Sequence, residues 1–478
     1  MGQITVVGLG PGDPRFLTRE AWEVLAGAGE LWLRTRTHPT VEGLPESLVI
    51  HSFDGLYEEL ETFDAVYRAI VDRLMALVQR PAGVVYGVPG HPLVGEATVK
   101  RLLERVDAET SVRIVEGLSF VEPTLTALQI DALDGLQVFD AADLAARHHP
   151  PINPDYPALL GQLYSRLIAS EVKLVLMNQY PDDHLVTLIE GAGTEQLRVD
   201  RMPLFELDRR DDLAHLTSLY VPPLPGTSSF EAFQETIARL RAPGGCPWDR
   251  EQTHESLRVN LLEEAYEVVA AIDAGDVEDI QEELGDLLLQ VVIQTQVAAE
   301  ADEFKMPDVI AGIDAKLKYR HPHVWGEREV SGSEEVIRRW EELKDQEKDG
   351  RESILGSVPR ALPALQQADT YGRRAARVGF DWSGAEGVVD KIREEIAELV
   401  AAATPEERES ELGDLLFAVV NWARWLDIDP EAALRQTNTR FKCRFGAMER
   451  LADAQGLRLS DLTIDELEQL WQTVKQEE

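Results

Sequence analysis

The sequence predicts a multidomain protein in which an α/β domain is followed by two all-α helical repeats. Apolar strand-like runs alternate with helical stretches over residues 1–222, a pattern typical of a mostly parallel sheet. The proline-rich segment 221–226 can continue neither a helix nor a strand, and we expect a linker there. An acidic helical pattern then occurs twice, about 130 residues apart, which indicates a long internal duplication. We therefore expect domains at 1–222, 228–350 and 351–478.

The composition is that of a globular protein with an excess of negative charge. The 478 residues are 44% hydrophobic and 28% charged, and 86 acidic against 47 basic residues give a net charge of −39. A field of this sign repels phosphate backbones, so we expect neither general nucleic-acid binding nor binding to anionic membranes. Two cysteines form no disulfide framework, and no run of 18 or more apolar residues occurs. Residues 1–12 predict a strand and a glycine turn, so we expect no signal peptide there. These features favour a cytoplasmic protein without a membrane span.

The first domain has four candidate strands, at residues 4–7, 84–86, 112–115 and 173–177. In a parallel sheet, ligand loops lie at the strand ends. The first strand runs into a glycine-rich turn at residues 8–13, but Asp13 stands where the third glycine of a dinucleotide-binding fingerprint belongs. By itself this turn is either a tight turn or a ligand loop.

The second domain carries two acidic pairs. Glu264 and Glu267 are three residues apart and share one helix face, as do Glu283 and Asp286. The turn-forming residues 273–276 lie between them and predict an antiparallel hairpin that brings four carboxylates to one point. The following run is apolar nearly all round, which predicts a buried second helix. Crowded, poorly solvated carboxylates repel one another unless a cation meets them, and an all-oxygen set suits Mg2+ or Mn2+.

The same arrangement recurs in the third domain. The corresponding acids are Glu395, Glu398, Glu411 and Asp414. For a single pair of acids, a solvated acidic face is the ordinary explanation. That explanation is weaker here, because the same glycine and the same apolar helix follow the acids in both copies.

Each repeat also carries a basic pair after its apolar helix. Lys316 and Arg320 are four residues apart, and so are Arg440 and Arg444, so each pair projects from one helix face. In a chain this acidic, cations at a fixed distance from a carboxylate cluster suggest a phosphate clamp. The alternative is ordinary ion pairing with nearby glutamates.

A third correspondence joins a tryptophan to a lysine near the end of each repeat. The pairs are Trp340 with Lys344 and Trp471 with Lys475. An indole can stack on a nucleobase with little selectivity between bases. A tryptophan of the hydrophobic core is the alternative.

The first domain resembles the tetrapyrrole methylase family, whose members bind S-adenosylmethionine. The segments that carry the resemblance are residues 8–13, 88–93 and 116–119. The resemblance implies a cofactor site that includes Gly10, Gly12, Gly90 and His91. The chain departs from the family where His91 replaces an acidic residue and Glu116 replaces a proline. A methyltransferase and a degenerate or regulatory methylase-like domain both stay open.

Residues 228–478 strongly resemble the MazG family of all-α nucleoside triphosphate pyrophosphohydrolases. The matching segments are 245–254, 263–286 and 320–324 in the first repeat and 378–382 in the second. The resemblance implies hydrolysis of NTPs and dNTPs to the monophosphate and pyrophosphate. It also implies a homodimer that completes the helical bundle. A non-catalytic helical scaffold is the competing interpretation.

The resemblance assigns a role to each group of residues. The carboxylate clusters would hold Mg2+ or Mn2+, and Glu263 or Glu394 would orient or deprotonate the attacking water. The basic pairs would hold the phosphates, and the tryptophan–lysine pairs would close over the nucleotide. Because Cys443 stands where a basic residue is common in the family, which copy is active stays open.

Overall fold

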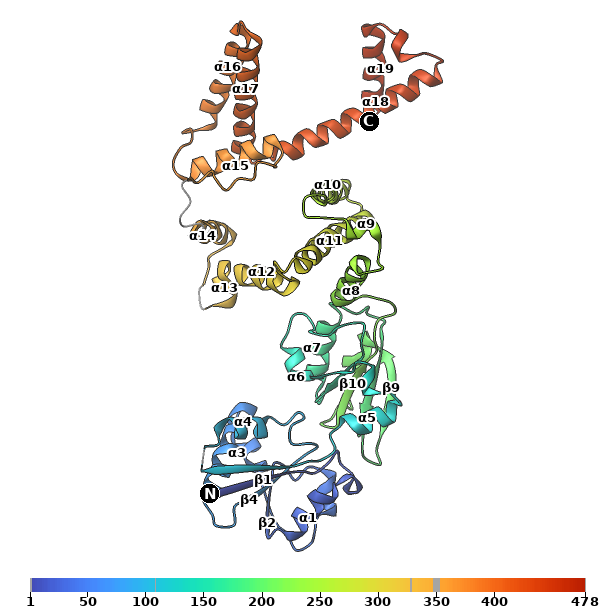
Figure 1. Cartoon of the computed structure of the whole chain (residues 1–478), viewed down its shortest axis with the longest axis vertical. Helices are drawn as coiled ribbons and strands as arrows, with labels where there is room; N and C mark the ends of the chain where they lie inside the picture. Colours follow the sequence, from blue (N-terminus) through green and yellow to red (C-terminus); the bar gives the residue numbers. More distant parts are fainter. Residues whose placement is uncertain (1, 108, 327–328, 347–352, 478) are drawn as a thin grey trace. The chain divides into compact units, whose positions relative to one another are not determined.

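The computed structural model describes residues 2–107, 109–326, 329–346 and 353–477 (Figure 1). The chain divides into two compact units, Met1–Val309 and Ile310–Glu478. This division falls inside the helix α12 (Met306–Arg320), which therefore contributes to both units. The domain boundaries expected near residues 222 and 350 stay predictions.

The first sheet is parallel throughout, with the strand order β3-β2-β4-β1-β5. Its strands are β1 (Gly2–Gly8), β2 (Glu30–Leu33), β3 (Val49–Ser52), β4 (Val84–Val88) and β5 (Thr110–Val115). Ile4 in the central strand pairs with Val84 on one side and with Val112 on the other. The predicted strands at 4–7, 84–86 and 112–115 and the predicted parallel sheet are confirmed.

Helices cover both faces of this sheet (Figure 1). They are η1 (Pro14–Phe16), α1 (Arg19–Gly27), η2 (Pro39–Gly43), α2 (Asp54–Glu59), α3 (Phe63–Leu77) and α4 (Ala97–Arg105). Ile70 and Leu74 of α3 are fully buried in one cluster with Ile4. Leu25 of α1 is buried with Val7 in a second cluster. Alternate residues of β1 thus face opposite helical layers, as the period of a strand requires.

A second, mixed sheet follows, with the strand order β6-β7-β10-β8-β9. Its strands are β6 (Gln137–Asp140), β7 (Ala158–Gly161), β8 (Leu185–Glu190), β9 (Arg198–Pro203) and β10 (Thr217–Val221). The pair β6–β7 is parallel and the other three pairs are antiparallel. The helices of this part are α5 (Val121–Leu128), η3 (Ala132–Asp134), α6 (Ala141–Ala145), α7 (Arg166–Leu176) and η4 (Leu204–Arg209).

The strand predicted at 173–177 is wrong, because this segment forms the end of α7. The side chain of Ser165 caps the helix by accepting a hydrogen bond from the amide of Ile168. Ala169, Val172 and Leu176 are then buried at the spacing of a helix. A short apolar run does not distinguish a strand from the buried face of a helix, and the upstream cap and periodicity decide here.

The first acidic hairpin consists of α10 (Arg258–Ala274) and α11 (Val277–Glu300), which pack against each other. They are preceded by α8 (Phe230–Arg241) and α9 (Pro247–Arg250). Gly275 ends α10 in the left-handed conformation, with φ of 70°. The carboxylate of Asp276 then accepts hydrogen bonds from the amides of Glu278 (3.0 Å) and Asp279 (3.2 Å) at the start of α11. The predicted turn and hairpin are confirmed.

The burial of α11 differs from the expectation. Val292 and Ile293 are buried together with Ile237 of α8, as predicted. In the first half of the helix, however, Leu284 is 50% and Leu288 is 41% exposed. The prediction of a fully buried helix is therefore wrong for one chain, because α8 and α10 leave part of its apolar surface uncovered.

The second unit is helical in its described residues. It contains the end of α12, then α13 (Pro322–Trp325), α14 (Ser333–Gln346), α15 (Ala364–Arg377), α16 (Ala385–Ala401), α17 (Pro405–Trp425), α18 (Pro430–Ala454), η5 (Leu459–Asp461) and α19 (Ile464–Glu477). The second acidic hairpin is α16–α17, and Thr404 and Glu407 form a capping box at the start of α17. Among the described helices of the whole chain, none has the length and apolar character of a membrane span.

Candidate metal centres and substrate-binding residues

The first hairpin brings three of its four predicted metal ligands together. Glu264 and Glu267 on α10 and Glu283 on α11 each offer a carboxylate oxygen, and these oxygens lie within 4.8 Å of one another. Glu264 and Glu283 are half-buried, and Glu267 is exposed. Oxygen donors at this spacing fit a hard divalent ion.

Burial and the crowding of the acids raise the affinity of Glu264 and Glu283 for protons. Burial raises the pKa of Glu264, and the negative charge of Asp286 and a hydrogen bond with Glu267 raise it further. Burial followed by the charge of Glu267 raises the pKa of Glu283. Asp286, the fourth predicted ligand, lies outside the group of three oxygens, but its charge acts on both of these residues. The cluster is thus electrostatically unfavourable until a cation meets it.

The second hairpin forms a similar group from Glu395, Glu411 and Asp414, whose carboxylate oxygens also lie within 4.8 Å of one another. The side chain of Glu395 is 5% exposed. Burial raises the pKa of Glu411, and the charge of Glu398 is the next cause. Glu398, the fourth predicted ligand, therefore acts on the group from its edge.

A lysine that sequence reasoning missed lies beside the second cluster. The Lys391 ammonium is 2.8 Å from Oε1 of Glu394 and 2.7 Å from Oε1 of Glu395. It precedes them on α16 by three and four residues, and this spacing was the signal by which it could have been found. Glu394, the residue expected to act on water, is therefore ion-paired. Both Glu394 and its counterpart Glu263 are exposed.

The structure joins two of the predicted substrate-binding residues of the first repeat. The guanidinium of Arg320, at the end of α12, lies 5.3 Å from the centre of the Trp340 ring on α14. Lys316 is exposed one turn earlier on α12. The side chain of Lys344 lies outside the described residues. These residues belong to the second unit, and Glu264 belongs to the first.

In the second repeat, Trp471 packs against the buried cluster that includes Met448, and its ring centre is 5.3 Å from that of Phe441. This packing fits a tryptophan of the hydrophobic core as well as one that stacks on a nucleobase. Arg440 is exposed and donates a hydrogen bond to the Thr437 hydroxyl at 2.8 Å. The remaining predicted residues of this group are Arg444, which is half-buried, and Lys475, which is exposed.

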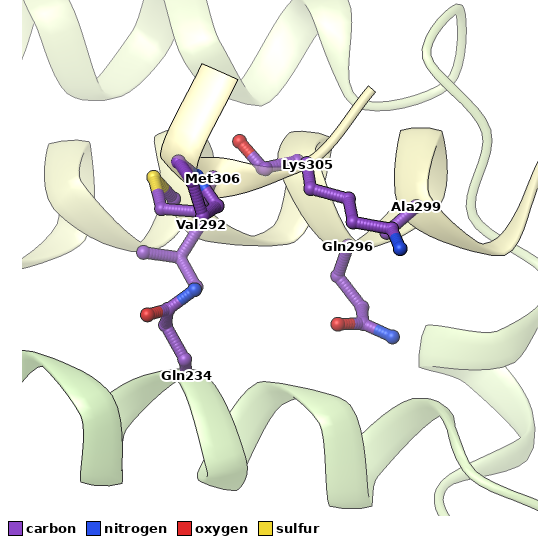
Figure 2. A pocket seen from close by; sticks show the side chains of 8 residues that line it. Gln234, Val292, Gln296, Ala299, Lys305 and Met306 are labelled. Atoms are coloured by element: carbon purple, nitrogen blue, oxygen red, sulfur yellow. The ribbon is translucent and has the colours of Figure 1, made fainter. Parts of the chain in front are cut away.

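A pocket of about 260 Å³ lies beside the first hairpin, but it is not the metal centre. In Figure 2 it is surrounded by Gln234 from α8, Val292 and Gln296 from α11, and Lys305 and Met306 at the start of α12. The lining contains no carboxylate. Its chemistry does not suit a divalent cation, in contrast to that of the carboxylate clusters.

The glycine loops of the first domain lie together, as the predicted cofactor site requires. Gly90 donates a backbone hydrogen bond to Gly10 (2.9 Å), and Gly10 donates one back (3.3 Å). Their φ angles of 66° and 75° favour glycine. A Cβ on Gly12 would lie 2.6 Å from the Thr194 methyl group, and Nδ1 of His91 accepts a hydrogen bond from its own loop. Gly10 and Gly90 therefore meet just beyond the ends of β1 and β4, where parallel sheets bind ligands.

Comparison with known proteins matches both halves of the chain. Residues 252–325 match the MazG nucleotide pyrophosphohydrolase domain, and residues 3–208 match the tetrapyrrole (corrin/porphyrin) methylases. The chain is 41% identical to the uncharacterized protein YabN of Bacillus subtilis, and the match covers 100% of this chain and 99% of that protein. It is 44% identical to the nucleoside triphosphate pyrophosphohydrolase/pyrophosphatase MazG of Thermotoga maritima, over 52% of this chain and 95% of that protein. The nucleoside triphosphate pyrophosphohydrolase of Escherichia coli K12 is also 44% identical, over 51% of this chain and 95% of its own length.

An α/β domain with a parallel sheet, followed by paired helices with clustered carboxylates, defines a class of proteins that join a methylase fold to a helical nucleotide hydrolase. The chain belongs to the MazG family, in the form that carries a tetrapyrrole methylase domain ahead of the MazG part. Both resemblances expected from the sequence are confirmed.

Proposed function

We propose that this chain hydrolyses nucleoside triphosphates to the monophosphate and pyrophosphate, with its two carboxylate clusters as metal centres. The observation that carries the proposal is the convergence of three carboxylate oxygens within 4.8 Å in each helical hairpin. It is supported by the relatives in Thermotoga maritima and Escherichia coli, which are nucleoside triphosphate pyrophosphohydrolases by name and match about half of the chain.

The donor sets fit Mg2+ or Mn2+, because every ligand is a carboxylate oxygen. Burial, and after it the charges of neighbouring acids, raises the pKa of Glu264, Glu283 and Glu411. A divalent ion bound there would neutralise the triphosphate and polarise the phosphoryl group under attack.

The chain's own side chains would position the substrate and the water. Exposed Glu263, next to the ligand Glu264, would orient the attacking water and accept its proton. Lys316 and Arg320 would hold the phosphate tail, and Trp340, already in contact with Arg320, would support the base. In the second repeat, Glu394, the Arg440–Arg444 pair and the Trp471–Lys475 pair would take these roles.

The test is pyrophosphate release from a panel of NTPs and dNTPs in the presence of Mg2+. The double variant Glu264→Gln with Glu395→Gln should abolish release, because each hairpin loses a central ligand. Glu235→Gln, an exposed acid on α8, is the matched control and should behave as the wild type. Full activity in the double variant would rule out the clusters as the site.

We also propose a homodimer in the cytoplasm. The uncovered side chains of Leu284 (50% exposed) and Leu288 (41%) on α11 have counterparts in Leu412 (48%) and Leu416 (49%) on α17. Apolar helix faces of this kind are usually covered by a partner. Light scattering coupled to size exclusion should give twice the chain mass, and a monomeric mass would refute the dimer.

Both cysteines are free, in keeping with a reducing compartment, and cell fractionation tests the location.

S-adenosylmethionine binding by the first domain is a second candidate function, and the contact between the Gly10 and Gly90 loops favours it. Calorimetric titration with S-adenosylmethionine should give saturable heat that Gly90→Val removes, because valine does not tolerate the φ of 66° there. Absence of heat from the wild-type protein at high ligand concentration would end this candidate.

A further inference from the structure

The two carboxylate clusters differ in their third acid, Glu267 in one and Asp414 in the other, and in a charged side chain beside the second cluster. In the second repeat, the Lys391 ammonium lies between Glu394 and Glu395, at 2.8 and 2.7 Å. Glu395 is one of the three acids whose oxygens converge, so the ammonium lies at the edge of the proposed metal centre. A monovalent cation that belongs to the chain already neutralises part of this cluster.

In the described part of the first repeat, no such cation lies beside the acids. The residue four positions before Glu264 is Asn260, at the place on α10 that Lys391 takes on α16. Among the residues that the structure describes, no lysine or arginine forms an ion pair with Glu264, Glu267 or Glu283. The duplicated hairpins therefore both carry convergent acids and differ in their counter-charge.

This difference acts directly on metal binding. A divalent ion that enters the first cluster meets acids whose ionised forms are disfavoured, and any cation stabilises those forms. An ion entering the second cluster must first break the two charge-assisted hydrogen bonds that hold Glu395 and Glu394 to the ammonium, or bind beside an uncompensated positive charge.

We propose that Lys391 is a built-in competitor for the divalent ion in the second repeat, so that the first cluster fills at lower metal concentration. The inference rests on the proposed function and deepens it, because it makes the first repeat the one that turns over nucleotide when metal is scarce. Glu395 is buried but Lys391 keeps part of its side chain in solvent, which screens the pair. We therefore assign the ion pair about 1 kcal/mol and expect the two affinities to differ by about fivefold.

The experiment measures Mn2+ binding to the full chain, with free Mn2+ followed by electron paramagnetic resonance. Two parent proteins isolate the clusters. Glu264→Gln with Glu267→Gln leaves the second cluster, and Glu411→Gln with Asp414→Asn leaves the first. The first cluster should bind Mn2+ about fivefold more tightly than the second.

Reciprocal substitutions then test the cause. In the parent that keeps the second cluster, Lys391→Asn should tighten Mn2+ binding by about fivefold, whereas Lys391→Arg, which retains the charge, should leave it weak. In the parent that keeps the first cluster, Asn260→Lys should weaken binding by a similar factor. Circular dichroism melts confirm that each variant folds.

The outcomes separate the two proposals. Equal affinities at the two clusters, or no change on Lys391→Asn, would overturn the competitor role even if pyrophosphate release is intact. Absence of Mn2+ binding at both clusters would overturn the metal centres themselves and this inference with them. Loss of hydrolysis with the predicted affinities preserved would contradict only the proposed function.

Discussion

Arg241 on α8 donates from Nε and Nη2 to the two carboxylate oxygens of Glu300 on α11, at 3.0 and 2.9 Å. Its side chain is 5% exposed, and Nη1 donates to the backbone carbonyls of Asp249 and Gln252. One buried guanidinium thus ties α8 to the acidic hairpin and holds the segment that leads into α10.

Arg241→Met should destabilise the helical part of the first unit by about 2–4 kcal/mol, since it leaves two backbone carbonyls without their donor and removes the arginine hydrogen bonds to Glu300. Hydrogen exchange should accelerate in α8 and in residues 247–257. Arg239→Met removes an exposed arginine from the same helix and is the control, with little expected effect. Equal protection in both variants would show that the contact is not structural.

Glu264→Gln should have opposite effects on stability without and with metal. Because the pKa of Glu264 is raised in the folded state, its ionised carboxylate destabilises the fold when the pH lies above that pKa. The destabilisation disappears as the pH falls below the ordinary value of 4.5, where the carboxyl is protonated in both states. At neutral pH with a chelator, the variant should be more stable than the wild type by less than about 1 kcal/mol, because solvent screens the group. With millimolar Mg2+ the order should reverse. Thermal melts under the two conditions measure this, and an unchanged order would count against a metal at this cluster.

The sequence predicted the two hairpins because their signals are local. The turn at Gly275 and Asp276 and the spacing of the acids act within one or two helical turns, so they could be recognised without the fold. The end of α7 was misassigned because its cap at Ser165 lies outside the apolar run. The exposure of Leu288 could not be predicted, because periodicity shows which residues are apolar but not what covers them.

Within the candidate site, the sequence predicted which acids meet but not what surrounds them. The convergence of Glu264 with Glu283 follows from helix spacing and an antiparallel turn. The pairing of Lys391 with Glu395 depends on the rotamer of the lysine side chain. The electrostatic attraction of all the acids in the cluster determines that rotamer, and sequence spacing alone does not show it.

His38 should make the stability of the first domain depend on mildly acidic pH. Both of its ring nitrogens are buried without a hydrogen-bond partner among the described residues, and burial, followed by the charge of His215, lowers its pKa from 6.5 to about 4. Between pH 6.5 and about 4, the unfolded chain therefore binds a proton at His38 that the folded chain does not bind. Stability is complete above pH 6.5 and falls as the pH approaches 4, by about 3 kcal/mol. Denaturant titrations at several pH values across this range give the free energy of unfolding. Its slope against pH should be shallower for His38→Phe than for His148→Phe, an exposed control. Parallel slopes would contradict the assignment.

Arg34→Met should destabilise the first domain by about 3–5 kcal/mol. Arg34 lies 2.6 Å from Glu96, whose side chain is 1% exposed, and it also donates to the hydroxyls of Tyr57 (3.0 Å) and Tyr67 (3.2 Å). Removing the arginine leaves a buried carboxylate without its counter-charge. Arg68→Met breaks an exposed ion pair with Asp64 and should cost less than about 1 kcal/mol. Chemical denaturation measures both, and similar losses in the two variants would show that the buried pair has no special role.

The turn at the tip of the first hairpin determines how the acids of α10 and α11 face one another. Gly275 and Asp276 join α10 to α11 with no spare residue. The positive φ of Gly275 lets the chain reverse at once, so that Glu283 on α11 faces Glu264 on α10. The second hairpin reverses over the three residues 402–404 and begins α17 with the cap at Thr404, so two tips that differ in length and in chemistry both bring acids together.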